Sequence, residues 1–302
     1  MGLGVATLVF ITLVWGTTFV VVKQALDTIP VPLLLAVRFS LAAACFAFVR
    51  FDRRAVVPAL GLGVLAFAGF ATQTIGLSLT SASNAAFLTG LAVVLTPMVA
   101  AVAWRRAIAP RVYLAAVAAA FGLGLLTLGD GGVAAVNAGD LWVLLTAVTY
   151  AFYVVYLGEV AGRAPVFALA GMQHLPMAAL AWAWAWPQRS ALAEVPLATY
   201  GVIVYLAVVA TALVAVLQVV AQRVVPAPLT ALVFVLEPVF AAGFAAWWLG
   251  ERLTPIAWLG AALVLAAMAI SELRGGARRI RPGSPGPSAG DATMRASPTR
   301  TR

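Results

Sequence analysis

Long apolar stretches separated by sparse polar positions dominate the chain. Between Arg54 and Arg105 there are fifty consecutive residues without a charge, whereas one transmembrane helix needs about 20 predominantly apolar residues. Cutting the sequence at charges and at Pro/Gly positions predicts ten membrane-spanning helices joined by short connections, and therefore an all-α integral membrane protein. Their approximate centres are Thr12, Leu41, Ala66, Ala92, Ala119, Val148, Leu175, Ala210, Val239 and Ala266.

The two ends of the chain differ from each other. The apolar run from Gly2 to Val22 lacks a basic leader and exceeds the roughly 7–15 apolar residues of a signal peptide, so we expect a permanent span. From residue 274 the chain turns rich in Arg, Pro, Gly and Ser (RGGARRIRPGSPGPSAGD). Such a composition cannot bury apolar surface, so residues 274–302 are expected to form a disordered basic cytoplasmic tail.

An internal repeat relates the two halves. An offset of 141 sets AFLTGLAVVLTPMVAA, from Ala86, over APLTALVFVLEPVFAA, from Ala227, with nine of sixteen positions identical. A weaker offset of 135 sets Trp15 against Tyr150 and Arg38 against Gln173. Five spans per half is an odd number, so residues 138–273 are expected to lie upside down relative to residues 3–130. Inverted repeats of this kind are typical of secondary transporters, whose substrate sites lie near the midplane.

Composition and charge fit this interpretation. Hydrophobic residues make up 64% of the chain and charged residues only 10%, against roughly 25% charge in a soluble domain. Fifteen of the nineteen basic residues fall on one side of the predicted membrane and three on the other, which predicts that both termini are cytoplasmic. The net charge of +9 is therefore an orientation signal rather than a sign of nucleic-acid binding. The single cysteine, Cys45, excludes an intrachain disulfide and a CxxC metal site.

Prolines lie in the middle of the fourth and ninth predicted spans. Pro97 and Pro238 each remove a backbone donor and leave the carbonyls of Val93 and Phe234 without their usual partners. Corresponding interrupted helices in two halves point to a binding site between them. The alternative is a kink that serves packing alone.

Two charged side chains are predicted inside the membrane. Glu237 lies about ten residues into its span, where an acid costs roughly 2.5–3.5 kcal/mol, so it is expected to face the interior. It could couple transport to protons, bind and orient a substrate ammonium group, or form a structural pair with Arg38 or a freed carbonyl. Arg38 itself could bind a carboxylate, snorkel towards the surface, or pair with Glu237.

Further polar and aromatic side chains recur at helical spacing and are expected to face the bundle interior. Interhelical hydrogen bonding is the alternative role for each of them. His174, the only histidine, could serve a proton relay or be satisfied by a helix carbonyl. The candidate substrate-binding residues are Trp15, Thr18, Phe19, Gln73, Asn84, Phe87, Tyr150 and Gln218.

Several segments resemble the EamA family of the drug/metabolite transporter superfamily. They are WGTTFVVVKQAL from Trp15, RFSLAA from Arg38, SASNAAFLTGLAVVLTPMVAA from Ser81 and LEPVFAAGFAAWWLGERLTP from Leu236. The resemblance covers about residues 3–273. It implies ten helices, an internal duplication, and export or exchange of small metabolites such as amino acids across a bacterial inner membrane. The fourth span ends in AWRRAIAP, without the acidic residue that many relatives have there.

The expected function is secondary transport by alternating access, of a small neutral or zwitterionic metabolite with an apolar part. No P-loop is present, and one or two interior cations argue against phosphorylated substrates. The alternative is an intramembrane hydrolase centred on His174, although GxSxG and HExxH motifs are absent. A channel would need a ring of like charges, which no span carries. We expect no cofactor and no metal; a homodimer is left open.

Overall fold

The computed structural model of the chain describes residues 1–80, 82–129, 137–248 and 254–273. These residues form helices and no β-strand, which confirms the all-α prediction. The predicted tail at 274–302 lies outside the described residues, as do residues 130–136 between the two predicted halves.

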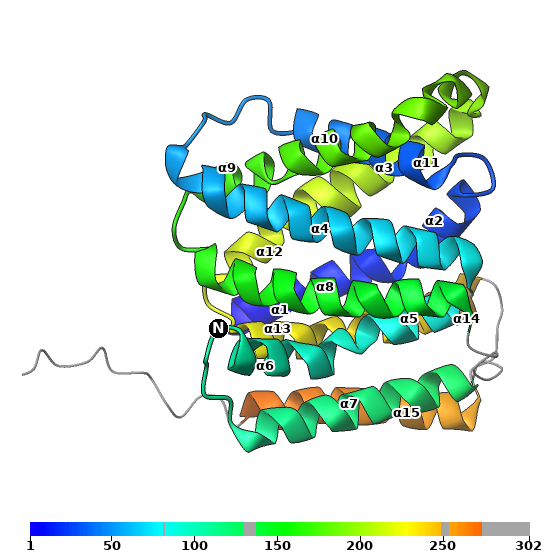
Figure 1. Cartoon of the computed structure of the whole chain (residues 1–302). Coiled ribbons are helices and arrows are strands. Elements are labelled where there is room, and N and C mark those ends of the chain that lie inside the picture. The colour runs from blue at the N-terminus through cyan, green and yellow to red at the C-terminus, as the bar shows by residue number, and fades with distance from the viewer. Residues whose placement is uncertain (81, 130–136, 249–253, 274–302) are drawn as a thin grey trace, which may run out of the picture.

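The helices follow one another with short connections in both halves (Figure 1). The first half comprises α1 (Gly2–Gly16), α2 (Thr18–Ala25), α3 (Val31–Ala44), α4 (Arg53–Leu79), α5 (Ala82–Gly90), α6 (Ala92–Val102) and α7 (Pro110–Gly129). The second half comprises α8 (Ala138–Val160), α9 (Val166–Met172), α10 (His174–Ala185), a 3₁₀ helix (Trp186–Glu194), α11 (Leu197–Ala207), a π-helix (Val208–Leu213), α12 (Val214–Gln222), α13 (Ala227–Phe234), α14 (Leu236–Trp248) and α15 (Pro255–Leu273).

Seven segments of the described chain are long and apolar enough to cross a membrane, in place of the ten spans predicted. They are Gly2–Ala25, Arg53–Leu79, Asn84–Val102, Ala138–Val160, Val166–Glu194, Leu197–Gln222 and Ala227–Phe244. Three shorter apolar helices, Val31–Ala44, Pro110–Leu125 and Pro255–Ala267, accompany them. Val31–Ala44, with 14 residues, falls below the length of about 18–20 residues that a span needs. The other two apolar segments are parts of longer helices, since α7 continues to Gly129 and α15 to Leu273.

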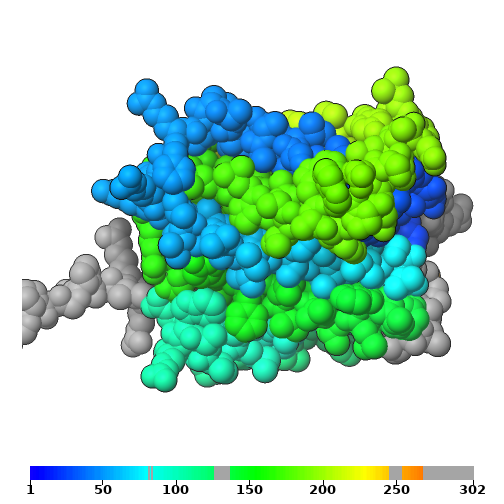
Figure 2. Space-filling model, turned by 45° about the horizontal axis from the view of Figure 1, so that its top comes forward, coloured from blue at the N-terminus to red at the C-terminus, as the bar shows by residue number. Residues whose placement is uncertain are grey.

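Helices of the two halves pair with each other. α7 packs along α15, α4 along α8, and α3 along α10, so each pair takes one helix from each half (Figure 1). Figure 2 shows the same interleaving at the surface, where blue segments of the first half lie beside green and yellow-green segments of the second. The halves therefore share one core, and a site between them is built by both.

The outer surface is rich in large apolar side chains. Val57, Leu114, Phe121 and Trp258 are each more than half exposed. A monomeric soluble protein rarely exposes apolar patches beyond a few hundred Å², whereas hydrocarbon accommodates such a surface. The buried interior instead contains polar residues, including Arg38, Gln173 and Gln218. This inside-out distribution of polarity is typical of a membrane bundle.

Candidate substrate cavity

Helix irregularities occur in five of the seven long segments. α1 passes into α2 at Thr17, α5 into α6 at Leu91, α9 into α10 at Gln173, and α13 into α14 at Val235, while the π-helix separates α11 from α12. Two of these breaks fall N-terminal to Pro97 and Pro238 rather than at them, as expected for a residue that disturbs the backbone before it. Irregular backbone at membrane depth is tolerated where it lines a cavity.

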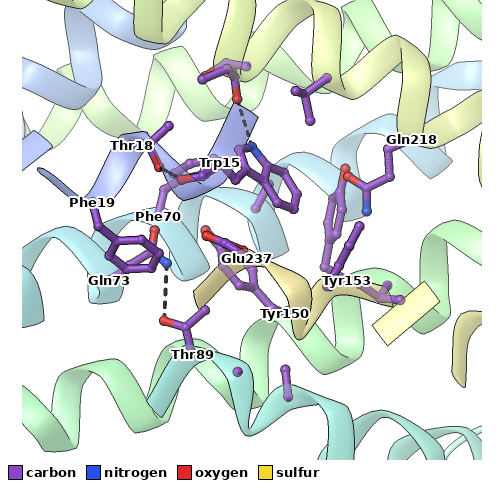
Figure 3. Close-up of a pocket in the computed structure, with 18 of the residues that line it drawn as sticks. Trp15, Thr18, Phe19, Phe70, Gln73, Thr89, Tyr150, Tyr153, Gln218 and Glu237 are labelled. Atoms are coloured by element: carbon purple, nitrogen blue, oxygen red, sulfur yellow. Dashed lines mark hydrogen bonds between the residues drawn. The ribbon is translucent and has the colours of Figure 1, made fainter. Parts of the chain in front are cut away.

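One cavity lies against all five irregularities (Figure 3). Its lining includes Gly90 and Ala92 beside the break between α5 and α6, and Val235 at the break between α13 and α14. Trp15, Tyr150 and Glu237 project into the same space from three different helices. The cavity therefore lies where backbone of both halves departs from regular α-helix.

The two sequence offsets relate lining residues of the first half to lining residues of the second. Eleven pairs of equivalent positions have both members in the lining, so that twenty-two of its thirty-two residues are matched between the halves. The offset of 135 pairs Trp15 with Tyr150, Thr18 with Tyr153, Phe19 with Val154, and Arg38 with Gln173. The offset of 141 pairs Phe70 with Thr211, Gln73 with Val214, Thr74 with Ala215, Leu77 with Gln218, Gly90 with Ala231, Val93 with Phe234, and Thr96 with Glu237.

Aromatic rings form much of the cavity wall. The Trp15 ring meets Phe234 edge to face, with centroids 5.1 Å apart, and the Phe70 and Tyr150 rings meet similarly at 6.0 Å. Nε1 of Trp15 donates a 3.1 Å hydrogen bond to the carbonyl oxygen of Ala210 in the π-helix. That bond fixes the indole plane, so the wall offers pre-positioned apolar area to a ligand.

Amide and hydroxyl groups are held by short networks around the wall. Gln73 donates to the Thr89 hydroxyl at 3.3 Å, and the Tyr153 hydroxyl donates to Oε1 of Gln173 at 3.0 Å. Gln218 donates to Gln222 (3.1 Å), whose own amide donates to the carbonyl of Val154 at 2.8 Å. These groups supply hydrogen-bonding capacity at fixed places, as small-molecule sites require.

Glu237 lines the cavity from the first turn of α14, where the helix N-terminus favours a carboxylate. Within the described residues its carboxylate makes no ion pair and no hydrogen bond; the one ion pair found there joins Arg106 to Glu159. A pair with Arg38, one of the alternatives that the sequence left open for Glu237, is absent among the described residues, where Nε of Arg38 donates to Thr211. A carboxylate without a protein partner remains available to a ligand or a proton.

His174 also faces the cavity, and its ring stacks on Phe46 with centroids 5.5 Å apart. Its buried Nδ1 has no partner within hydrogen-bonding geometry, although the backbone carbonyls of Ala170 and Gly171, one turn earlier, lie close enough to interact with the imidazole. Among the described residues, no serine hydroxyl or carboxylate hydrogen-bonds to the imidazole. The described residues around His174 therefore form no nucleophile–base pair of the kind that a hydrolase uses.

Most of the candidate residues from the sequence meet in this cavity. Six of the eight candidate substrate-binding residues line it: Trp15, Thr18, Phe19, Gln73, Tyr150 and Gln218. Arg38, Glu237 and Pro238 do so as well, but Asn84, Phe87 and Pro97 do not. Asn84 is buried in α5, and the Phe87 ring lies near Gly124 of α7. Periodicity alone could not separate the cavity-facing side of α5 from the side that packs on α7.

Other lining residues were not among the candidates. Phe70, Thr89 and Phe234 carry no signal beyond general apolar or weakly polar character in the sequence. Thr211 and Tyr153 do carry a signal, since both belong to polar stripes at helical spacing. The offset of 141 also pairs Phe70 with Thr211 by sequence alone, so the repeat itself could have drawn attention to Phe70.

An ion pair and an aromatic cluster connect the two halves near the end of α8. Arg106, after α6, forms a two-pronged ion pair with Glu159 near the end of α8, with its shortest nitrogen–oxygen distance at 2.7 Å. Hydrogen bonding to that carboxylate raises the pKa of Arg106. Trp104 packs on Phe152 and Tyr156 beneath this pair. The ion pair therefore joins a residue of the first half to one of the second.

The opposite end is built differently. Nζ of Lys23 donates to the carbonyls of Leu77 (2.7 Å) and Thr80 (2.9 Å) at the end of α4. The Thr80 hydroxyl donates to Asp140 of α8 at 2.6 Å. The cavity lining reaches Leu77, next to this network. The lining and this network therefore share a residue, because the Leu77 carbonyl accepts from Lys23.

The fold is that of a multi-pass membrane protein with a cavity lined by both halves, and comparison with known proteins gives its class. The model of the EamA-like transporter family matches residues 2–128 and 137–272, so the chain belongs to that family. The prediction made from the sequence motifs is confirmed. Family membership implies a small-molecule substrate and contact with membrane lipid.

Two further likenesses agree with this assignment. An uncharacterized transporter of Archaeoglobus fulgidus is 29% identical over 268 residues, covering 88% of this chain and 85% of that protein. A solved crystal structure shares the fold with a TM-score of 0.69 at 17% identity, covering 88% of this chain and 95% of the other. The second likeness concerns the fold alone.

Proposed function

We propose that this protein is a secondary-active transporter that exports or exchanges small neutral or zwitterionic metabolites, such as amino acids, by alternating access. One observation carries the proposal: both halves line a single cavity at equivalent positions. In an inverted repeat, exchange of the two halves' conformations converts a cavity open on one side into one open on the other. A binding site shared by equivalent residues is what this cycle needs.

The proposal includes ten spans in two inverted five-helix repeats. The seven long segments and the three shorter apolar helices together supply ten crossings. A short helix can cross where the bilayer thins or where flanking residues snorkel. The distribution of basic residues supports a placement of both termini in the cytoplasm, and we propose a bacterial inner membrane as the location.

The substrate class follows from the cavity chemistry. Arg38 and Glu237 are its charged residues among the described lining, one of each sign. A phosphorylated substrate would need several Arg or Lys ligands, whereas the aromatic wall suits an apolar group. We therefore assign substrate contact to Trp15, Thr18, Phe19, Gln73, Tyr150 and Gln218; Asn84 and Phe87 are left out because they are not in the lining.

Glu237 is proposed to carry the coupling proton or to orient the substrate. Both roles require a carboxylate that no protein cation neutralises, and the absence of an ion pair to Glu237 among the described residues supports this. Its equivalent in the first half is Thr96, which has no charge. The carboxylate thus acts in one half only, and substitution of this one residue isolates its role.

Counterflow in proteoliposomes tests the proposed function. Vesicles loaded with an unlabelled candidate, such as L-leucine, L-phenylalanine or L-alanine, are diluted into the same radiolabelled compound without any ion gradient. Saturable uptake of label that depends on the internal compound supports a transporter. Empty vesicles and vesicles loaded with a sugar phosphate serve as controls. Flux that rises linearly with concentration and ignores the internal compound would indicate a channel and contradict the proposal.

A further inference from the structure

We infer that Arg38 is the carboxylate-binding subsite of the cavity and that Thr211 is its positioning residue. The inference deepens the proposed function and rests on it, since it names the group by which the transported molecule is recognised: a carboxylate attached to an apolar part. It also assigns a role to the π-helix between α11 and α12, which the transport cycle does not by itself require.

Arg38 is held by one side of its guanidinium only. Nε donates a 2.8 Å hydrogen bond to the Thr211 hydroxyl. No other guanidinium nitrogen of Arg38 donates to a described residue, and no described carboxylate lies within ion-pair distance. The residue is only 3% exposed, so this cation has been moved into the bundle without a countercharge. Such burial is costly unless a ligand completes the pairing.

The two remaining guanidinium nitrogens keep some accessible surface, and Arg38 belongs to the cavity lining. Across the described side chains, Nδ1 of His174 is the one fully buried nitrogen or oxygen without a partner. The unbonded Arg38 nitrogens are therefore accessible, and Arg38 lines the cavity. The terminal nitrogens of a guanidinium present parallel N–H donors that match the two oxygens of a carboxylate.

An aromatic floor fixes the plane of the guanidinium. Its central carbon lies 4.6 Å from the centroid of the Phe70 ring, which is a cation–π contact. Phe70 is itself held edge to face by Phe39, which is fully buried, and by Tyr150. The guanidinium thus has one face on Phe70 and one edge on Thr211, so its remaining edge is pre-oriented for a planar anion.

The π-helix places Thr211 for this task. The Thr211 hydroxyl donates to the carbonyl of Leu206, five residues earlier, at 2.7 Å, and so can accept from Arg38 in a defined direction. The neighbouring carbonyl of Ala210 receives Nε1 of Trp15. π-Helical turns expose backbone groups and are frequent at functional sites. Here one such turn aligns both the cationic subsite and the indole wall.

The arrangement predicts how a zwitterion lies in the cavity. Its carboxylate accepts from the free edge of Arg38, its apolar part contacts the aromatic wall around Trp15, and its ammonium group is left to Glu237, the unpaired anion. The equivalents of Arg38 and Glu237 by repeat offset are Gln173 and Thr96, both neutral. These two charges therefore distinguish the halves of an otherwise matched site, so that a zwitterion binds in one orientation.

The test compares amino acids with their amides, which keep the shape and the ammonium group but lose the negative charge. Binding of L-alanine, L-leucine and L-phenylalanine, and of the three amides, is measured by calorimetry on the purified full-length protein. We expect at least one acid to bind roughly tenfold or more tightly than its amide, as hydrogen bonds to a charged group suggest. Arg38→Gln, which installs the residue found at the equivalent position, should abolish that preference.

Variants of Thr211 test whether this residue orients Arg38 or only stabilises the fold. Thr211→Val keeps the shape but removes the acceptor for Nε, so we expect the preference for the acid to fall severalfold while affinity for the amide is unchanged. Thr211→Ser restores the hydroxyl and should restore the preference. A purely structural effect would lower affinity for acid and amide alike. Should an Arg38 variant fail to fold, the Thr211 pair and the wild-type acid-to-amide ratio still decide the question.

Binding and counterflow measurements together distinguish failure of the Arg38 subsite from failure of the proposed transport function. Preference for the acid without counterflow keeps the subsite and refutes the transporter. Counterflow without preference for the acid refutes the subsite and keeps the transporter. The inference is also overturned if no acid binds, or if Thr211→Val discriminates acid from amide as well as the wild type does.

Discussion

Nε1 of Trp15 donates a 3.1 Å hydrogen bond to the carbonyl of Ala210, so a side chain of the first half is tied to the π-helix of the second. The same indole packs edge to face on Phe234, another second-half residue. Trp15 therefore sits at the contact between the halves as well as in the cavity wall. Any movement of one half against the other must change its surroundings.

Replacement of Trp15 separates its two contacts. Trp15→Phe keeps an aromatic ring but loses the hydrogen bond to Ala210, whose typical net worth of about 1 kcal/mol predicts a roughly fivefold rise in KM. Trp15→Ala also removes the ring and should raise KM further. Both values come from the concentration dependence of counterflow. An unchanged KM in the Ala variant would remove Trp15 from the substrate wall.

Replacement of Glu237 tests proton coupling. Glu237→Gln keeps the size of the side chain but cannot exchange a proton at neutral pH. Accumulation driven by a pH gradient should be lost, while counterflow without a gradient should persist at a raised KM, because the substrate ammonium group loses its anionic partner. Glu194→Gln, in the exposed 3₁₀ helix after α10, is the matched control and should keep both activities. If the Glu237→Gln protein still accumulates substrate against its gradient, coupling lies elsewhere.

Close approach of helices at Gly63 should control stability. A Cβ on Gly63 would collide with the backbone carbonyl of Gln173 and the ring of Pro176, whereas one on Gly201 would meet nothing within 4 Å. Overpacking of about 1–3 kcal/mol predicts that Gly63→Ala lowers Tm by roughly 2–10 °C. Gly201→Ala should leave Tm unchanged or slightly higher. Thermal unfolding in detergent measures both, and equal Tm values for the two variants would refute the close packing of α4 on α10.

We expect the ion pair of Arg106 and Glu159 to restrict access to the cavity from its end of the bundle. The side chains are 59% and 23% exposed, and surface pairs contribute about 0.2–1 kcal/mol, so Glu159→Gln should raise access from this end by at most about fivefold. Labelling of a cavity cysteine from the Arg106 side measures that access. The reversed pair, Arg106→Glu with Glu159→Arg, should return it towards the wild-type value. Failure of the double variant to do so would assign closure to Trp104 and its aromatic neighbours.

Much of the architecture was predictable because lipid imposes strong rules. Long uncharged stretches indicate the helices, and the segments around Pro97 and Pro238 reveal the duplication by their matching residues. The three short helices behave differently: Val31–Ala44 is apolar enough to be predicted as a span but falls below the length criterion. Hydropathy locates an apolar segment well and its helical ends poorly.

Site residues were predictable where a polar side chain interrupts an apolar span. They were not predictable where helix packing determines which side chains face the cavity. Glu237, Arg38 and Gln218 stand out because polar groups avoid lipid, and all three line the cavity. Asn84 is equally polar but is buried in α5 away from the lining. The partner of Arg38 could not be predicted, because a π-helical turn brings Thr211 to its Nε and no sequence pattern signals that turn.

Two-sided access to the cavity is the central claim, and a single cysteine tests it most directly. The chain has one native cysteine, so Cys45→Ala gives a cysteine-free background. In that background Thr18→Cys places a thiol in the cavity, and Leu13→Cys places one at the apolar exterior, where Leu13 is 38% exposed. A charged, membrane-impermeant thiol reagent is applied to each face of the membrane in turn, with and without substrate.

We predict that the cavity cysteine at position 18 reacts from both faces, that substrate slows both reactions, and that the cysteine at position 13 reacts from neither. Reaction from one face alone, under every substrate condition, would contradict alternating access.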